Sequence, residues 1–127
     1  MIASIHGTLR LVDGDHAVVE VGGLGLEVLA SGRTLGGLAG RLGEDVSLHT
    51  YLHVREDALQ LFGFRSVRER VFFLWLIGVS GVGPKVALAV LSGYPVEELE
   101  LAVAITHTHH NSAAFAAALR RTPGRRR

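Results

Sequence analysis

The chain has 127 residues, a formal net charge of +1, 48% hydrophobic residues, 20% charged residues and no cysteine. This length suits one ordinary domain or two very small ones, and the lack of cysteine excludes disulfides and thiolate metal sites. The longest apolar run, Val71–Ile77, is far too short to span a membrane. The start, Met1–His6, lacks the basic and apolar regions of a signal peptide, so we expect a cytoplasmic protein with no membrane partner.

The basic residues are unevenly distributed. Five of the thirteen lie in the last eight positions, and without them the formal charge falls from +1 by five, to −4. A nonspecific nucleic-acid binder usually has a basic face. Any binding to nucleic acid is therefore expected from local sites and backbone amides, rather than from a broad positive patch.

Alternating apolar and polar residues in the first half predict β-strands. Ile5, Leu9 and Leu11 share one parity, and Asp13-Gly14 is typical of a hairpin turn. Further strands are predicted over 18–21, 24–29, 46–52 and 59–64, with a turn at Gly22-Gly23 and a short helix within 31–43. Five short strands with one longer connection predict a compact OB-type barrel over residues 1–65.

From residue 66 onward the hydrophobic period is that of helices. Ser66-Val67-Arg68-Glu69 fits a capping box, which predicts a helix from Val67 to near Gly78. A second helix is predicted from Lys85 to Ser92. Pro95 is expected at the first position of a third helix, with acidic residues near its positive end. The fold class is thus a β-barrel followed by an all-α domain over residues 66–104.

Ser80-Gly81-Val82-Gly83-Pro84-Lys85 joins the first two helices. The free backbone N–H groups and the positive dipole end at the start of the second helix form a site for an anion. Gly81 and Gly83 can adopt positive φ and have no Cβ to block a close approach, so we expect a β-branched residue at Gly83 to disrupt the turn. Lys85, the only lysine, can meet the same anion. The pattern predicts a helix-hairpin-helix that binds nucleic-acid phosphate through Ser80, Gly81, Val82, Gly83 and Lys85.

Other interpretations of this segment fit less well. A Walker A loop fails because Pro84 and Val86 stand where lysine and a hydroxyl are required. A dinucleotide-binding loop fails because Val86 replaces the third glycine. A DNA glycosylase needs a carboxylate or lysine soon after the hairpin, and the residues after Lys85 are apolar through Leu91. A plain helix–helix corner stays open as the alternative. No catalytic activity, cofactor or metal is expected.

A series of segments, in order along residues 1 to about 104, resembles the RuvA family, whose members bind Holliday junctions within a branch-migration complex. The matching segments are Met1-Ile2-Ala3-Ser4-Ile5 with Gly7, Val21-Gly22-Gly23-Leu24-Gly25, Val54-Arg55-Glu56-Asp57-Ala58, Leu61-Phe62-Gly63-Phe64 and Val79-Ser80-Gly81-Val82-Gly83-Pro84-Lys85. The resemblance implies an OB-fold domain, helix-hairpin-helix motifs and a homotetramer that holds a four-way DNA junction open and flat. It also implies octamers, a RuvB-type ATPase and a RuvC-type resolvase as partners, and roles in recombination, DNA repair and the SOS response to DNA damage.

The same resemblance assigns a role to a charged turn, Arg55-Glu56-Asp57, between the fourth and fifth strands. The residues alone favour a solvated hairpin tip. By resemblance, Glu56 and Asp57 form an acidic pin that repels phosphates near the junction centre and helps to separate strands. Arg55 beside them is expected to contact a phosphate.

The resemblance ends near Ala104. Family members continue with a second hairpin and a domain that contacts the RuvB motor, whereas here a His-containing stretch, an alanine-rich run and Pro123-Gly124 with three arginines follow. We interpret residues 105–127 as a divergent, mobile tail, produced by truncation or by an altered reading frame. His107, His109 and His110 lack a nearby carboxylate or cysteine, so no metal site is expected. One hairpin and no RuvB contact are expected in this chain.

Two other functions compete with the junction scaffold. A generic OB and hairpin module that binds DNA without junction specificity, as single strands, predicts aromatic stacking platforms on the barrel. The barrel half offers Tyr51, Phe62 and Phe64 for this purpose. A purely structural oligomer predicts no DNA binding at any salt concentration.

Overall fold

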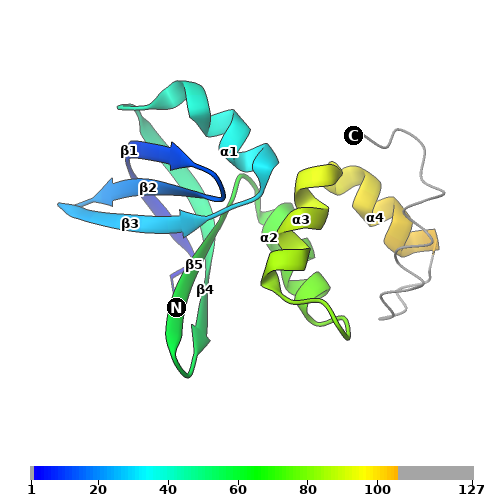
Figure 1. Ribbon diagram of the computed structural model, residues 1–127. Helices are drawn as coiled ribbons and strands as arrows, with labels where there is room; N and C mark the ends of the chain where they lie inside the picture. The colour runs from blue at the N-terminus through cyan, green and yellow to red at the C-terminus, as the bar shows by residue number, and fades with distance from the viewer. Residues whose placement is uncertain (1, 106–127) are drawn as a thin grey trace. The chain divides into compact units, whose positions relative to one another are not determined.

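A computed structural model of the chain describes residues 2–105 (Figure 1). The chain divides into two compact units, Met1–Arg70 and Val71–Arg127. The domain boundaries predicted at residues 65 and 104 remain predictions. The tail interpretation, including the three histidines and Pro123-Gly124, lies outside the described residues.

The first unit is a closed five-stranded barrel, which confirms the predicted OB-type fold. Its strands are β1 (Ser4–Asp13), β2 (His16–Val21), β3 (Leu24–Leu29), β4 (Asp45–Arg55) and β5 (Ala58–Phe64). The order around the barrel is β1-β2-β3-β5-β4. Only β3 and β5 pair in parallel; the other neighbours are antiparallel. The predicted short helix is present between β3 and β4, as α1 (Gly32–Leu38) followed by the 3-10 turn η1 (Ala39–Arg41).

Alternate residues of the strands fill the barrel with apolar side chains. Leu9, Ala17, Val19 and Val28 are fully buried, and Val46, Leu48 and Leu61 join them. Burial of this surface is the main favourable contribution to folding. Two glycines leave room for close neighbours, a side chain at Gly63 and the adjacent backbone at Gly7. A Cβ at Gly63 would lie 2.5 Å from Val28 Cγ1, and one at Gly7 would overlap the Glu20 carbonyl oxygen.

Leu11 departs from the predicted pattern. Because it shares the parity of Ile5 and Leu9, Leu11 is expected to face the barrel interior, but it is 42% exposed. The register slips between Leu9, which pairs with Val19, and Leu11, which pairs with Val18. Such a bulge inserts one extra residue and reverses the faces of the side chains that follow. Val12 therefore packs against the core in place of Leu11.

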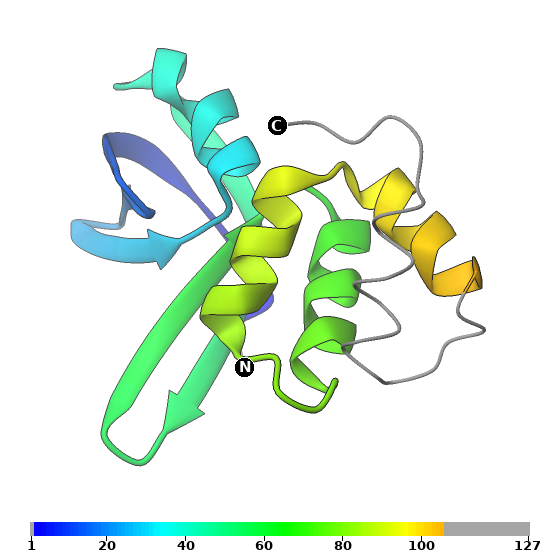
Figure 2. The same ribbon diagram turned by 45° about the vertical axis from the view of Figure 1, so that its right-hand side comes forward.

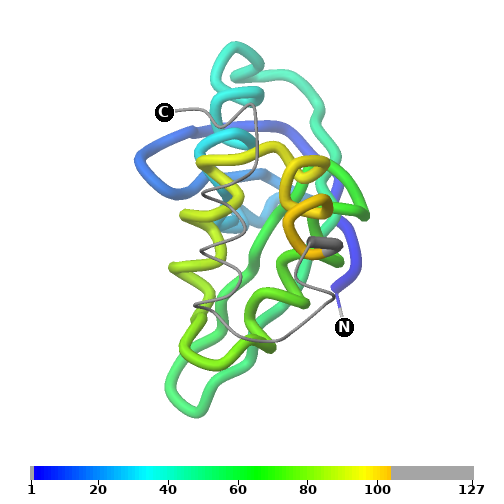
Figure 3. The backbone as a smooth tube through the Cα atoms, turned by 90° about the vertical axis from the view of Figure 1, so that its right-hand side faces the viewer, coloured from blue at the N-terminus to red at the C-terminus, as the bar shows by residue number. Residues whose placement is uncertain are grey.

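The hairpin of β4 and β5 extends beyond the rest of the barrel (Figures 1 and 3). β1 pairs with β4 only as far as His49, and β3 pairs with β5 only at Leu61 and Phe62. Residues 53–60 therefore pair only with each other across the hairpin. At a strand rise of about 3.3 Å per residue, the turn lies about 13 Å beyond Leu61.

Helices make up the described part of the second unit. α2 (Val67–Ile77) begins in the first unit, and α3 (Pro84–Gly93) and α4 (Val96–Ile105) follow. α2 and α3 lie side by side and are joined at one end by a short loop (Figures 1 and 2). Their buried apolar residues are Phe72, Phe73, Leu76, Ala87 and Leu91, with Val79 from the loop and Val96, Leu99 and Ala102 from α4. No helix within residues 2–105 is long and apolar enough to cross a membrane.

Two predicted helix starts differ by one residue from the structure. α3 begins at Pro84 rather than Lys85, because proline suits a first helical position that needs no N–H donor. Pro95 precedes α4 instead of occupying its first position. Its carbonyl oxygen accepts from the amides of Glu98 and Leu99, as a residue that caps a helix does.

Candidate nucleic-acid interface

Tight turns build the loop between α2 and α3. The amides of Gly78 and Val79 donate to the carbonyl oxygens of Trp75 and Leu76, three residues earlier, so the helix ends in a tightened turn. The Val82 amide then donates to the Val79 carbonyl oxygen at 3.0 Å and closes a second turn. Val79 is 3% exposed and anchors the loop. The Val82 amide is thus already bonded inside the loop.

The two loop glycines have different conformations. Gly81 has φ +84°, as expected at the third position of a type II turn closed by Val79 and Val82. Gly83 has φ −94° and ψ 178°, which is extended backbone that any residue can adopt. A Cβ at Gly83 would meet nothing within 4 Å. The expectation that a β-branched residue at Gly83 disrupts the turn is therefore wrong, and Gly81 is the position where the turn requires glycine.

The start of α3 offers donors to solvent. Gly83 is its N-cap, and the Gly83 carbonyl oxygen accepts the first helical hydrogen bond from Ala87 at 3.0 Å. Pro84 has no N–H, so the amides of Lys85 and Val86 are the first-turn donors with no partner inside the helix. Ser80, Gly81, Gly83 and Lys85 are all exposed. Backbone donors, a helix dipole and one ammonium group are thus gathered on an exposed loop, which is the chemistry of an anion site. A helix precedes the loop, whereas a Walker A loop follows a strand, so this geometry also excludes the Walker A interpretation.

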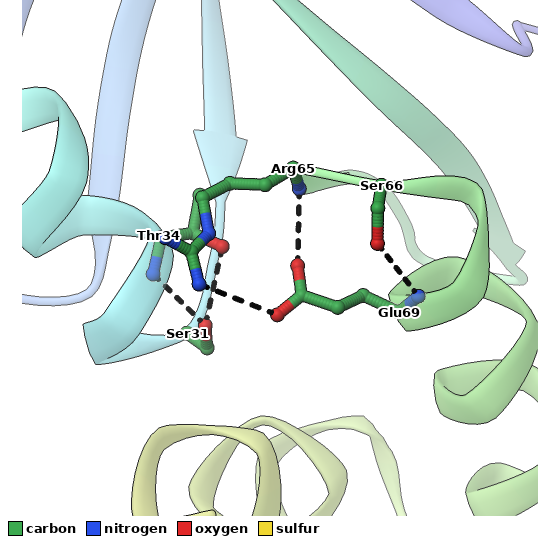
Figure 4. Close-up of polar contacts among 5 residues, drawn as sticks. All are labelled: Ser31, Thr34, Arg65, Ser66 and Glu69. Carbon is green, nitrogen blue, oxygen red and sulfur yellow. Dashed lines mark hydrogen bonds and ion pairs between the residues drawn. The ribbon is translucent and has the colours of Figure 1, made fainter. Parts of the chain in front are cut away.

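Polar contacts fix the first turn of α2 to the end of β5 (Figure 4). The Glu69 amide donates to Ser66 Oγ at 3.2 Å, as the capping box predicts. The Glu69 carboxylate, however, accepts from the Arg65 amide at 3.1 Å instead of the Ser66 amide. Its other oxygen lies 4.0 Å from Arg65 Nη2. Glu69 is 5% exposed, so this buried carboxylate ties Arg65, two residues before the helix, to the first turn of α2.

Further contacts in the first unit surround the connection between β5 and α2. Arg65 lies beside Gly37 of α1, and α1 itself is capped by Ser31, whose Oγ accepts from the Thr34 amide at 3.2 Å. Arg70 donates from Nη1 to the Ala3 carbonyl oxygen at 2.9 Å. The helix that leads to the candidate phosphate loop is therefore anchored at its start by side chains of Arg65, Glu69 and Arg70.

The acidic turn lies at the tip of the β4–β5 hairpin. Arg55 ends β4 and pairs with Ala58, so Glu56 and Asp57 form a two-residue connection. All three charged residues are exposed. The tip is thus a solvated, net negative point at the end of a two-stranded ribbon. The candidate residues therefore fall into two groups: the acidic tip belongs to the first unit and the phosphate loop to the second.

Sequence reasoning missed two features near these groups. Val54 and Leu59 pair directly across the hairpin next to the acidic turn, and both are largely exposed. The sequence shows that Val54 and Leu59 are apolar, but it does not show that they lie beyond the strands that close the barrel. The second omission is the bond from the Arg65 amide to Glu69. No group of three or more metal-binding side chains occurs within the part of the chain that the structure describes.

The N-terminal part of the chain is similar to known proteins. The family model of the RuvA N terminal domain matches residues 1–63. The Holliday junction branch migration complex subunit RuvA of Herpetosiphon aurantiacus is 50% identical over 104 residues, which are 82% of this chain and 52% of that protein. The RuvA subunit of Chloroflexus aggregans is 48% identical over 104 residues, 82% of this chain and 53% of the relative. That of Bdellovibrio bacteriovorus is 50% identical over 93 residues, 73% and 47% respectively.

These matches lie in the N-terminal part of the chain. The chain spans about half the length of the curated relatives it matches. The matches include the barrel with its close-packed Gly7 and Gly63. Residues 1–63 are thus a RuvA N terminal domain, and the matched part as a whole is similar to RuvA subunits.

Proposed function

We propose that the chain binds four-way DNA junctions as a non-catalytic, cytoplasmic subunit of a branch-migration complex. The observation that carries the proposal is the exposed start of α3, where the free amides of Lys85 and Val86 adjoin the Lys85 ammonium group. Relatives with about half of their sequence identical over the matched residues are named as subunits of such a complex. Recombination and repair, including the SOS response, are the processes that this activity would serve.

The loop would hold a DNA phosphate without reading bases. In the proposed helix-hairpin-helix, the exposed residues Ser80, Gly81 and Gly83 precede the first-turn amides in the same loop. Contacts of this kind position a protein on DNA but carry no sequence information, and we assign them to phosphates on the minor-groove side. Val82 would contribute through loop geometry, because its amide already donates to Val79.

The acidic tip would act at the centre of the junction. Glu56 and Asp57 are exposed at the end of the ribbon, and like charges cost free energy when a phosphate approaches. The tip would therefore exclude phosphates from the centre and favour separation of the strands that pass it. Arg55 pairs with Ala58 on one face of the ribbon, where its guanidinium would contact a phosphate beside the excluded region.

The proposed scaffold is a homotetramer, which can pair into an octamer. Val67, Val71 and Leu74 recur at i, i+4 and i+7 along α2, and their exposed fractions are 46%, 57% and 38%. Residues at this spacing share one helix face, so α2 presents an apolar stripe suited to a neighbouring copy. A RuvB-type ATPase would supply the energy for migration, and a RuvC-type resolvase would act on the bound junction.

The alternative of a generic single-strand binder has less support. It requires exposed aromatic platforms, but Phe62 and Phe64 are each only 2% exposed. Tyr51 is half-buried, and its hydroxyl lies 3.3 Å from His53 Nδ1. The described barrel therefore lacks a row of free aromatic faces.

Native mass spectrometry of the chain mixed with a four-way junction tests the proposal. The expected mass is four chains, or eight, on one junction. A complex of one chain per junction would contradict the tetramer. Failure to form any complex would contradict the proposed DNA binding itself.

A further inference from the structure

An apolar pair lies on the β4–β5 ribbon immediately behind the acidic turn. Val54 is 59% exposed and Leu59 is 70% exposed, the highest value among the exposed large hydrophobic residues of the described chain. The two residues are directly opposite each other in the antiparallel register. Side chains at opposite positions project to the same face of a ribbon, so they form one continuous patch.

The register shows which face this is. Leu52 pairs with Leu61 two residues further back, and these two belong to the barrel core or pack against it. Because side chains alternate with period two, Val54 and Leu59 continue the core-facing row of the hairpin past the end of the barrel. The other face carries Arg55 with Ala58. The ribbon is therefore apolar on one face, basic on the other and acidic at its tip.

We propose that Val54 and Leu59 form the contact surface for a nucleobase that has left its base pair at the centre of the junction. This inference rests on the proposed function and adds a ligand to the acidic turn. A nucleobase is planar and uncharged, so it can lie against aliphatic side chains next to Glu56 and Asp57, where a phosphate is repelled. Apolar side chains inserted between bases are a common means by which proteins unstack DNA.

The size of the patch favours a base over a second copy of the chain. A stable protein interface needs about 800 Å² from each partner, and two aliphatic side chains on a narrow ribbon fall far short of that area. Self-association through the pair would also bring two acidic turns towards each other, which like charges oppose. One unpaired base matches the patch in both scale and charge.

The test uses a four-way junction that carries 2-aminopurine at the exchange point. Fluorescence of 2-aminopurine rises when the base leaves the stack, so binding of the wild-type chain should raise it. In the Val54→Thr, Leu59→Thr double variant the rise should fall by more than half, because threonine keeps the strand preference but removes apolar surface. Junction affinity should fall roughly fivefold.

Leu24→Thr is the matched control, since Leu24 is 67% exposed at the start of β3. It should leave the fluorescence rise and the affinity unchanged, and far-UV circular dichroism should show that all variants are folded. An unchanged rise in the folded double variant would overturn the inference. A double variant with an altered oligomeric mass would overturn it too, because the patch would then contact a second copy. If the wild-type chain binds the junction without raising the 2-aminopurine fluorescence, this inference is refuted and the proposed function is not. If the wild-type chain does not bind the junction, both are refuted.

Discussion

Gly81 and Gly83 differ in backbone conformation, and this difference separates the folding role of the loop from its binding role. Gly81→Ala places a Cβ on a residue at φ +84°, which costs about 1–2 kcal/mol for an L-residue in the left-handed region. The chain should therefore lose about that much stability. Junction binding should fall as well, because the turn that presents the start of α3 is strained.

Gly83→Ala should leave the fold nearly unchanged. Its φ of −94° suits alanine, and the added Cβ meets no atom within 4 Å. Alanine is a poorer N-cap by up to about 1 kcal/mol, but the smaller entropy of the unfolded chain offsets about 0.4–1 kcal/mol of this. The new methyl group would instead block close approach of a phosphate. Losing one hydrogen bond to a charged group costs about 1.5–3 kcal/mol, or roughly tenfold to a hundredfold in affinity.

Two assays on the same samples distinguish these effects. Urea unfolding can be followed by the fluorescence of Trp75, the only tryptophan, which lies in α2 just before the loop. Fluorescence anisotropy of a labelled four-way junction gives the affinity. Wild-type stability together with wild-type affinity in Gly83→Ala would refute the backbone–phosphate contact. Wild-type stability in Gly81→Ala would refute the left-handed turn.

Three further predictions concern the charged and close-packed residues. Lys85→Met should weaken binding to junctions of any base sequence. It should also lower the slope of log affinity against log salt concentration by about 0.9 for each phosphate that the chain no longer neutralises. Titrations at several salt concentrations measure this slope, and an unchanged slope would exclude a phosphate contact at Lys85. Glu69→Ala should destabilise the chain by about 1–3 kcal/mol in urea unfolding, because the Arg65 amide loses the charged acceptor of a part-buried hydrogen bond. The control Glu44→Ala removes an exposed ion pair and should cost less than about 1 kcal/mol; equal losses would argue against the role of Glu69. Gly63→Ala should lower the stability of the chain by about 1–3 kcal/mol, because the new Cβ would contact Val28. Gly7→Ala should lower it by more, because the obstructing atom is a backbone oxygen. In urea unfolding, a Gly7→Ala variant more stable than Gly63→Ala would contradict the close approach of β1 and β2.

Much of the fold follows from local patterns that have a direct physical cause. The strand alternation and the Ser66–Glu69 capping box predicted elements that the structure confirms. The Asp13-Gly14 pattern predicted the first hairpin, but its two-residue connection is Gly14-Asp15, because Asp13 still pairs with His16. The bulge beside Leu11 could not be predicted, because an alternating pattern contains no sign of a one-residue slip in pairing. The capping box likewise predicted the helix start but not the amide of Arg65 as the partner of Glu69.

The candidate site shows the same limit. Two glycines in Ser80–Lys85 look equivalent in the sequence, and only the hydrogen bond from Val82 to Val79 determines that Gly81 takes the positive φ. The exposure of Val54 and Leu59 depends on where β3 stops pairing with β5, near Leu61 and Phe62. That boundary is a property of strand pairing between distant segments, so no local pattern contains it.

The most direct test of junction recognition is a competition measurement. A labelled four-way junction bound to the chain is challenged with unlabelled junction or with linear duplex of equal length, at near-physiological salt. The proposed function predicts that unlabelled junction displaces the label at far lower concentration than duplex does. Equal displacement by duplex and junction, or no binding at all, would contradict a junction-specific scaffold.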